Sequence, residues 1–94
     1  MNLKIISDTV LAYNSLINDP SFYNTCLSTY ARQEISIIRH HITHAGLKVY
    51  VRNNVIDKGT IIGFFIMFDE VRFSVVDKKN LYHASWKDLT LYEY

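Results

Sequence analysis

The spacing of apolar residues changes near the middle of the chain. From Ser7 to Ala45 they recur every three to four residues, as on one side of an α-helix, whereas from Leu47 onward they alternate or form short blocks, as in strands. The pattern therefore predicts a helical first half and a β-rich second half.

Residues that cap and break helices divide the first half in two. Ser7 or Asp8 can cap a first helix, and Asp19 can cap a second one in which Pro20 takes the first turn. Gly46 can close the second helix, because glycine readily adopts the left-handed backbone found after a last helical turn. We therefore predict helices at about 8–18 and about 20–45.

The longer helix has one apolar and one polar face. At about 100° per residue, the apolar face collects Leu27, Ala31, Ile35, Ile38, Ile42 and Ala45. The opposite face collects Arg32, Ser36, Arg39, His40 and Thr43. We expect the apolar face to pack on a sheet and the polar face to remain open to a partner. The sheet residues expected to meet the helix are Ile62, Phe64, Ile66, Phe73 and Val75 or their alternate-face neighbours.

Turn residues divide the second half into short strands. The strands are expected at Leu47–Arg52, Thr60–Phe68, Val71–Val76, Leu81–Trp86 and Leu89–Tyr94. Connections this short require antiparallel pairing, because parallel strands need a long crossover. The sequence thus predicts a single α+β domain over residues 1–94, with two helices packed on an antiparallel meander of four to five strands at about 47–94. A closed SH3-like barrel is the alternative form of this sheet.

Composition supports an ordinary globular protein. The 94 residues are 49% hydrophobic and 20% charged, which excludes a disordered chain. The single cysteine, Cys26, cannot form an internal disulfide, and the apolar run Ile61–Phe68 is far shorter than the ~20 residues that span a bilayer. We expect a cytoplasmic protein without a membrane partner.

The charge distribution leaves nucleic acid as an alternative partner. The formal net charge is only +1, yet residues 31–58 hold five basic residues (Arg32, Arg39, Lys48, Arg52, Lys58) and two acidic ones (Glu34, Asp57). Aromatic residues expected on strands could stack on single-stranded bases. The candidates are Tyr50, Phe73, Tyr82 and Trp86.

Histidines near the end of the second helix are the clearest chemical cluster. His40 and His44 are four residues apart and could share a metal ion, and His41 and His44, three apart, are an alternative pair. Zinc, however, prefers three or four protein ligands. A small histidine-dependent nuclease, with Arg32 and Arg39 holding a phosphate and His83 as a distant partner, is the enzymatic alternative. Histidine also interacts favourably with a helix C-terminus. Because the chain has no phosphate-binding loop, nucleophile elbow or paired-carboxylate motif, we expect a non-catalytic protein without a cofactor.

The main hypothesis is a small protein that binds another macromolecule, most simply a protein, through a preformed surface. The short chain, rich in Asn, Ile, Tyr and Lys, resembles small accessory proteins of phages and other viruses with AT-rich genomes. That resemblance implies an inhibitor that binds a host protein in the host cytoplasm. The last strand is expected at a sheet edge, where it could also pair with a second copy of the chain. The residues expected to bind the partner are Arg32, Ser36, Arg39, His40, Thr43, Tyr92 and Tyr94.

Overall fold

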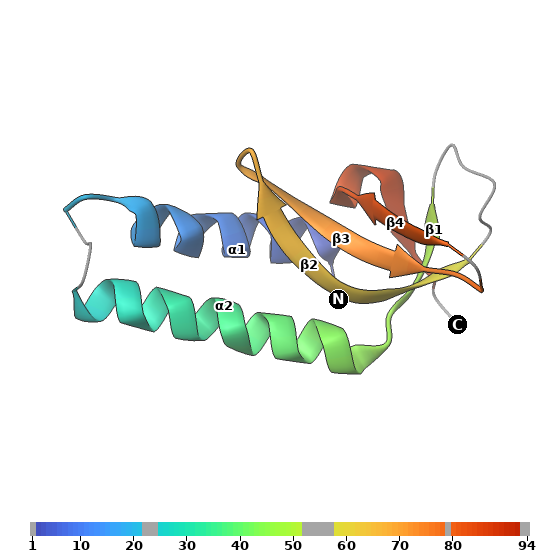
Figure 1. The fold of residues 1–94 in the computed structure, drawn as a ribbon, viewed down its shortest axis with the longest axis horizontal. Coiled ribbons are helices and arrows are strands. Elements are labelled where there is room, and N and C mark those ends of the chain that lie inside the picture. The colour runs from blue at the N-terminus through green and yellow to red at the C-terminus, as the bar shows by residue number, and fades with distance from the viewer. Residues whose placement is uncertain (1, 22–24, 52–57, 79, 93–94) are drawn as a thin grey trace.

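Two helices precede an antiparallel sheet. The computed structural model describes residues 2–21, 25–51, 58–78 and 80–92. Over these ranges the elements are α1 (Leu3–Asn18), α2 (Cys26–Ala45), β1 (Lys48–Val51), β2 (Gly59–Met67), β3 (Glu70–Val76), β4 (Leu81–Ala84), the short 3₁₀ helix η1 (Trp86–Asp88) and β5 (Leu89–Leu91) (Figure 1). This order confirms the predicted α+β class.

The sheet is open and its last strand departs from a meander. The strand order is β4-β3-β2-β1-β5. The first four strands follow one another as hairpins, but β5 returns to pair with β1, with Val49 opposite Leu91 and Val51 opposite Leu89. Among the described residues β4 and β5 form the two edges, so the sheet does not close into an SH3-like barrel. The short helix η1 lies between β4 and β5, and the apolar residues of β5 pair with the buried Val49 and the half-buried Val51 of β1.

The first helix begins earlier than predicted. Asn2 is its cap, and the Asn2 Oδ1 atom accepts hydrogen bonds from the backbone N–H groups of Lys4 (2.9 Å) and Ile5 (3.2 Å). Ser7, expected to be the cap, is buried inside the helix together with Leu3 and Val10. The predicted start at about residue 8 was wrong because Ser7, a small polar residue, interrupts the apolar stripe of α1. The stripe in fact continues to Leu3.

The second helix begins later than predicted. Thr25 caps α2, with its Oγ1 accepting from the Ser28 backbone N–H at 3.3 Å. Asp19 instead follows the end of α1 in an extended conformation, and its side chain accepts from the Ser21 N–H at 2.9 Å. The prediction of a helix from Pro20 is therefore wrong. The end at Gly46 is confirmed, because this glycine has a left-handed φ of 60°.

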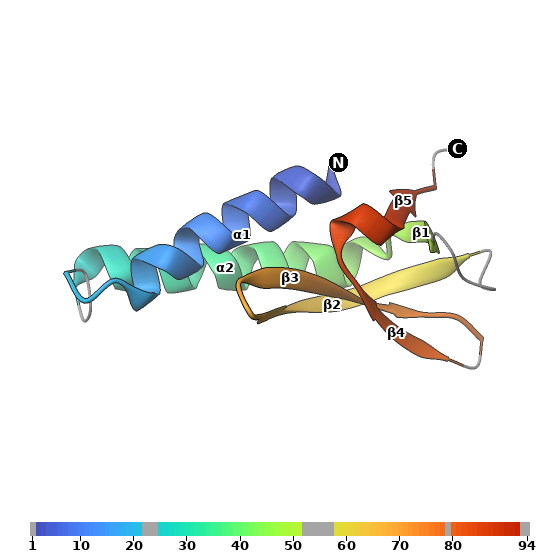
Figure 2. The same cartoon turned by 90° about the horizontal axis from the view of Figure 1, so that it is seen from above.

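The hydrophobic core lies between the helix pair and one face of the sheet. Figures 1 and 2 show α1 and α2 running side by side, with the β2–β3 hairpin against them. Val10 of α1, Ile42 of α2 and Phe73 of β3 are buried to 1% exposure or less. The inner residues of the two central strands join them in the same cluster: Ile61, Phe64, Val71 and Val75.

Three apolar positions depart from the predicted core. Leu27 is 39% exposed and Ala45 is also exposed, because the ends of α2 extend past the part of the helix that contacts the sheet. Ile62, expected to meet the helix, is 45% exposed. The register of β2 against β3 shifts between Ile61 and Gly63, and this irregularity leaves Ile61 rather than Ile62 on the buried face.

Candidate functional site

The polar face of α2 is exposed. Arg32, Ser36, Arg39, His40 and Thr43 all have exposed side chains. At 1.5 Å of rise per residue they extend over about 16 Å of the helix. Within the described part of the chain, neither Arg32 nor Arg39 has a carboxylate within ion-pair distance. Both guanidinium groups can therefore meet an acidic group on a partner.

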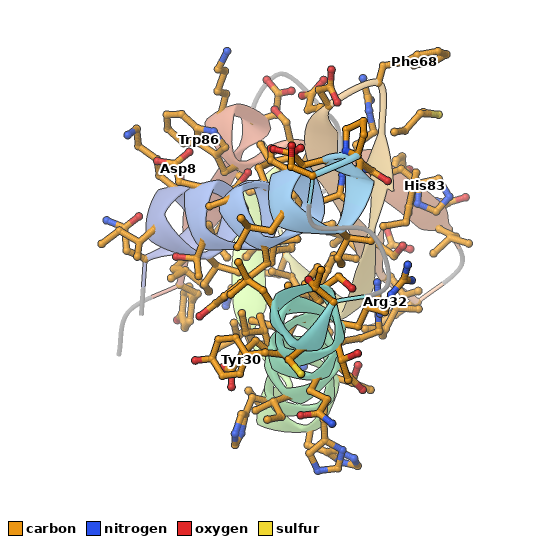
Figure 3. All side chains as sticks on the ribbon, turned by 90° about the vertical axis from the view of Figure 1, so that its left-hand side faces the viewer. Asp8, Tyr30, Arg32, Phe68, His83 and Trp86 are labelled. Atoms are coloured by element: carbon orange, nitrogen blue, oxygen red, sulfur yellow. The ribbon has the colours of Figure 1, made fainter. Side chains whose placement is uncertain are left out.

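Arg39 connects this helix face to the sheet. Its guanidinium carbon lies 4.7 Å from the ring centroid of Phe64 in β2, a cation–π contact with a ring that is 6% exposed. The contact restrains the long side chain at the boundary between α2 and β2. In Figure 3, Arg32 lies on the same side of the molecule as His83 of β4, whereas Tyr30 lies on the other side. The α2 face and the outer face of the sheet are thus both accessible from one side.

The outer face of the sheet, away from the helices, is partly apolar and partly polar. In β3 the inner residues Val71, Phe73 and Val75 are fully buried, while the residues between them are half-buried. On the outer face, Phe65 of β2 contacts the His83 ring at 4.9 Å between centroids, and His83 Nδ1 lies within hydrogen-bond distance of Ser74 Oγ (3.1 Å). These contacts fix side chains of three strands in one preformed strip.

Arg72 adds a hydrogen-bond donor to this strip. Its Nη2 lies 3.4 Å from a carboxylate oxygen of Glu70, two residues away in β3. Its Nε atom is buried and has no hydrogen-bond partner among the described residues. Buried donors are nearly always satisfied by a protein group or by water, so this N–H needs an acceptor that the described residues do not supply.

Among the described residues, the tip of the β2–β3 hairpin is the most exposed apolar point. Phe68 and Asp69 form a two-residue turn in which both φ angles are positive, 52° and 60°. Such turns favour Asn and Gly, because an ordinary side chain is strained in the left-handed region. Phe68 is nevertheless 93% exposed, and Met67 beside it is 39% exposed. Figure 3 shows the Phe68 ring pointing away from the rest of the molecule.

The position of this turn differs from the sequence-based prediction. The predicted strand Thr60–Phe68 includes Phe68, because this residue continues an apolar run. Only the pairing of Met67 with Glu70 shows that Phe68 lies between the strands. Asp69, a common turn residue, was the one local signal of this position.

The predicted tyrosine contribution lies apart from Arg32. Tyr92 is half-buried, its ring centroid is 5.2 Å from that of Tyr50, and Lys58 Nζ lies 4.4 Å from it. The Tyr92 backbone N–H donates to the Lys48 carbonyl at 2.8 Å, just beyond the C-terminal end of α2. Arg32 is about 20 Å along the helix from that end, so one compact patch does not include both. Tyr94 lies outside the described residues.

The aromatic residues suggested for base stacking are dispersed. Phe73 is completely buried, so the prediction that it could serve as a stacking surface is wrong. Trp86 is half-buried, with Lys4 Nζ 5.8 Å from its ring centroid, and Tyr82 is half-buried on β4. Tyr50 alone among the four is exposed, at 37%.

The histidines of α2 are all exposed. The rings of His40 and His44 are 4.1 Å apart between centroids, whereas those of His40 and His41 are 6.1 Å apart. In the described part of the chain, no group of three or more His, Cys, Asp or Glu side chains is placed to share a metal ion. Cys26, also exposed, lies at the opposite end of the helix.

A hollow of about 320 Å³ lies where the start of α1 meets η1 and β5. Lys4 and Lys87 line it beside Trp86. The Lys4 ammonium is already 3.1 Å from an Asp8 carboxylate oxygen, and Asn2 caps the adjacent helix end. These internal contacts make the hollow a weaker candidate for binding than the hairpin tip.

The comparisons add no relative from which a function could be transferred. Among the described residues, no helix combines the length and hydrophobicity needed to cross a membrane. Searches of protein-family models, curated proteins and solved structures give no significant match to this chain.

Proposed function

We propose that this chain is a non-catalytic binding protein whose partner is another protein. The exposure of Phe68 is the observation that supports this proposal best: its ring is 93% exposed on a strained two-residue turn. Neither the left-handed backbone nor the exposed ring stabilises the isolated chain. Burial of a phenylalanine side chain in a partner would contribute about 1.5–3 kcal/mol, a gain that a nucleic-acid backbone does not offer.

Phe68 and the arginines on the polar face of α2 indicate the chemistry of the partner. An apolar pocket would receive Phe68, and carboxylates would meet Arg32 and Arg39, which have no ion pair in the described part of the chain. In Figure 3, Phe68 lies at the top of the molecule and Arg32 lies lower on the right, and a partner that covers this part of the surface would contact both. By its resemblance to viral accessory proteins, the chain would act as an inhibitor of a host protein in the cytoplasm.

The test compares two surface variants with a control. Affinity purification from the organism that encodes the chain, followed by mass spectrometry, identifies a protein retained by the wild type. We expect Phe68→Asn to abolish its retention and Arg32→Glu with Arg39→Glu to weaken the measured affinity at least ~10-fold. Ile5→Asn, at an exposed position of α1, serves as the control and should retain the partner.

A stability measurement separates lost binding from lost folding. Asparagine tolerates the left-handed turn better than phenylalanine does, so Phe68→Asn should melt at the same temperature as the wild type or higher. A partner that binds both surface variants as tightly as the wild type would contradict the proposal.

Nucleic acid is the second candidate, favoured by the Tyr50–Tyr92 pair with Lys58 over the Tyr92 ring. Phosphate contacts would make log affinity fall steeply and linearly with log salt concentration. An interface centred on Phe68 would respond weakly. A second copy of the chain pairing along the β5 edge is the remaining alternative, and sedimentation of the purified protein would detect it.

A further inference from the structure

We infer that His40 and His44 form a two-ligand site for a divalent transition-metal ion near the C-terminal end of α2. Residues four apart lie on the same side of a helix, and here the two rings are 4.1 Å apart between centroids, at an interplanar angle of 55°. Both side chains are exposed. His40 also belongs to the polar face of α2 that was predicted to contact a partner, but metal binding by the two rings does not require that partner.

Two features of this position suit a metal dication. Neutral imidazole nitrogen is a common ligand for Zn²⁺, Cu²⁺ and Ni²⁺, bound to zinc at about 2.0–2.1 Å, and a single ion can reach both rings only if they lie side by side. The last helical turn also concentrates partial negative charge on its unpaired carbonyl groups, which favours a cation. Arg39 is the arginine of α2 nearest in sequence to the two histidines. Its positive charge is held over the Phe64 ring of β2.

The geometry distinguishes this pair from the other histidines. The His41 ring is 6.1 Å from that of His40 at an interplanar angle of 72°, and His83 lies on β4 beside Ser74. The described residues provide no group of three ligands. Water would therefore fill the remaining coordination positions, as at an open site.

The ligand set predicts an order of affinity. Two imidazoles should bind Cu²⁺ more tightly than Ni²⁺ or Zn²⁺, following the general order for nitrogen ligands. Mg²⁺ should not bind measurably, because it prefers oxygen ligands and retains its water. This order separates an imidazole site from a diffuse attraction of cations to carboxylates.

The experiment is a calorimetric titration of protein without a histidine tag, using the chlorides of Cu²⁺, Ni²⁺, Zn²⁺ and Mg²⁺. We expect His40→Ala and His44→Ala each to weaken Cu²⁺ and Zn²⁺ binding at least ~10-fold. His41→Ala is the matched control and should change the affinity by less than about twofold. All three residues are exposed on a helix, where alanine is well tolerated, so the variants should fold.

Thermal unfolding gives a second measurement. An ion that binds only the folded helix raises the melting temperature of the wild type, and it should not raise that of the His40→Ala, His44→Ala double variant. The inference is overturned if the wild type binds none of the transition ions, if the double variant binds them equally well, or if His41→Ala weakens binding as much as His40→Ala does.

Discussion

Gly59 and Gly63 lie in the same strand, β2, but their surroundings differ. Gly59 is buried, and a Cβ atom there would collide with Cγ1 of Val75. At Gly63, no atom of the described residues other than its chain neighbours lies within 4 Å of the corresponding position, and its φ is not positive. A side chain is therefore excluded at the first position by packing and admitted at the second.

This contrast yields a prediction for two single substitutions. Gly59→Ala should destabilise the protein by about 1–3 kcal/mol, because the added methyl group displaces a fully buried valine. Gly63→Ala should stay within about 1 kcal/mol of the wild type, since alanine reduces the entropy of the unfolded chain. Urea unfolding curves measure both values, and equal destabilisation would contradict the packing described for Gly59.

At the scale of elements, α2 shows a division between buried and exposed positions that its sequence period predicts. Ala31, Ile35 and Ile42 are buried, and Ile38 is half-buried. The period does not say how far the sheet extends beneath the helix, so the exposure of Leu27 could not be predicted from it. Contacts between elements, not the helix itself, set the length of the buried stripe.

Two isoleucines of α2 provide a matched comparison. Ile42 is 1% exposed and Ile37 is 48% exposed. Ile42→Ala should cost about 2–5 kcal/mol of unfolding free energy, because it removes buried methyl groups and leaves a cavity. Ile37→Ala should cost less than about 1 kcal/mol, since little area is lost and alanine favours helix. Similar losses in chemical denaturation would show that the helix register is incorrect.

At the scale of the whole molecule, an aromatic contact joins the two helices. The rings of Tyr13 in α1 and Tyr30 in α2 meet edge to face, with 6.1 Å between centroids. A side-chain hydrogen bond with Tyr30 raises the pKa of Tyr13 above its ordinary value, with desolvation as a smaller cause. The folded protein therefore favours the protonated phenol.

This preference predicts an alkaline loss of stability. The contribution of Tyr13 is fully present below the ordinary tyrosine pKa of about 10 and is lost as the pH rises through the higher pKa of the folded state. Between about pH 9 and pH 11 the wild type should lose more stability than Tyr13→Phe, which has no proton to release. Parallel stability curves for the two proteins would exclude this contribution.

The linear pattern of residues by itself determined the fold class, the order of helices before strands, the end of α2 at Gly46 and the exposed side of α2. These features depend on neighbours within about one helical turn or one hairpin, so their physical causes are local. The starts of both helices were wrong because cap-forming side chains occur at several positions, and packing decides which of them is used.

Only the tertiary structure decided the return of β5 to β1, the burial of Ile61 in place of Ile62 and the position of Phe68 at a hairpin tip. Each depends on pairing between residues distant in sequence, and a shift of one residue in a strand transfers a side chain to the opposite face. The same long-range packing holds Tyr92 apart from Arg32, although both were predicted to contact one partner. The local pattern determines which residues can be exposed, whereas the packing of elements determines which exposed residues lie together.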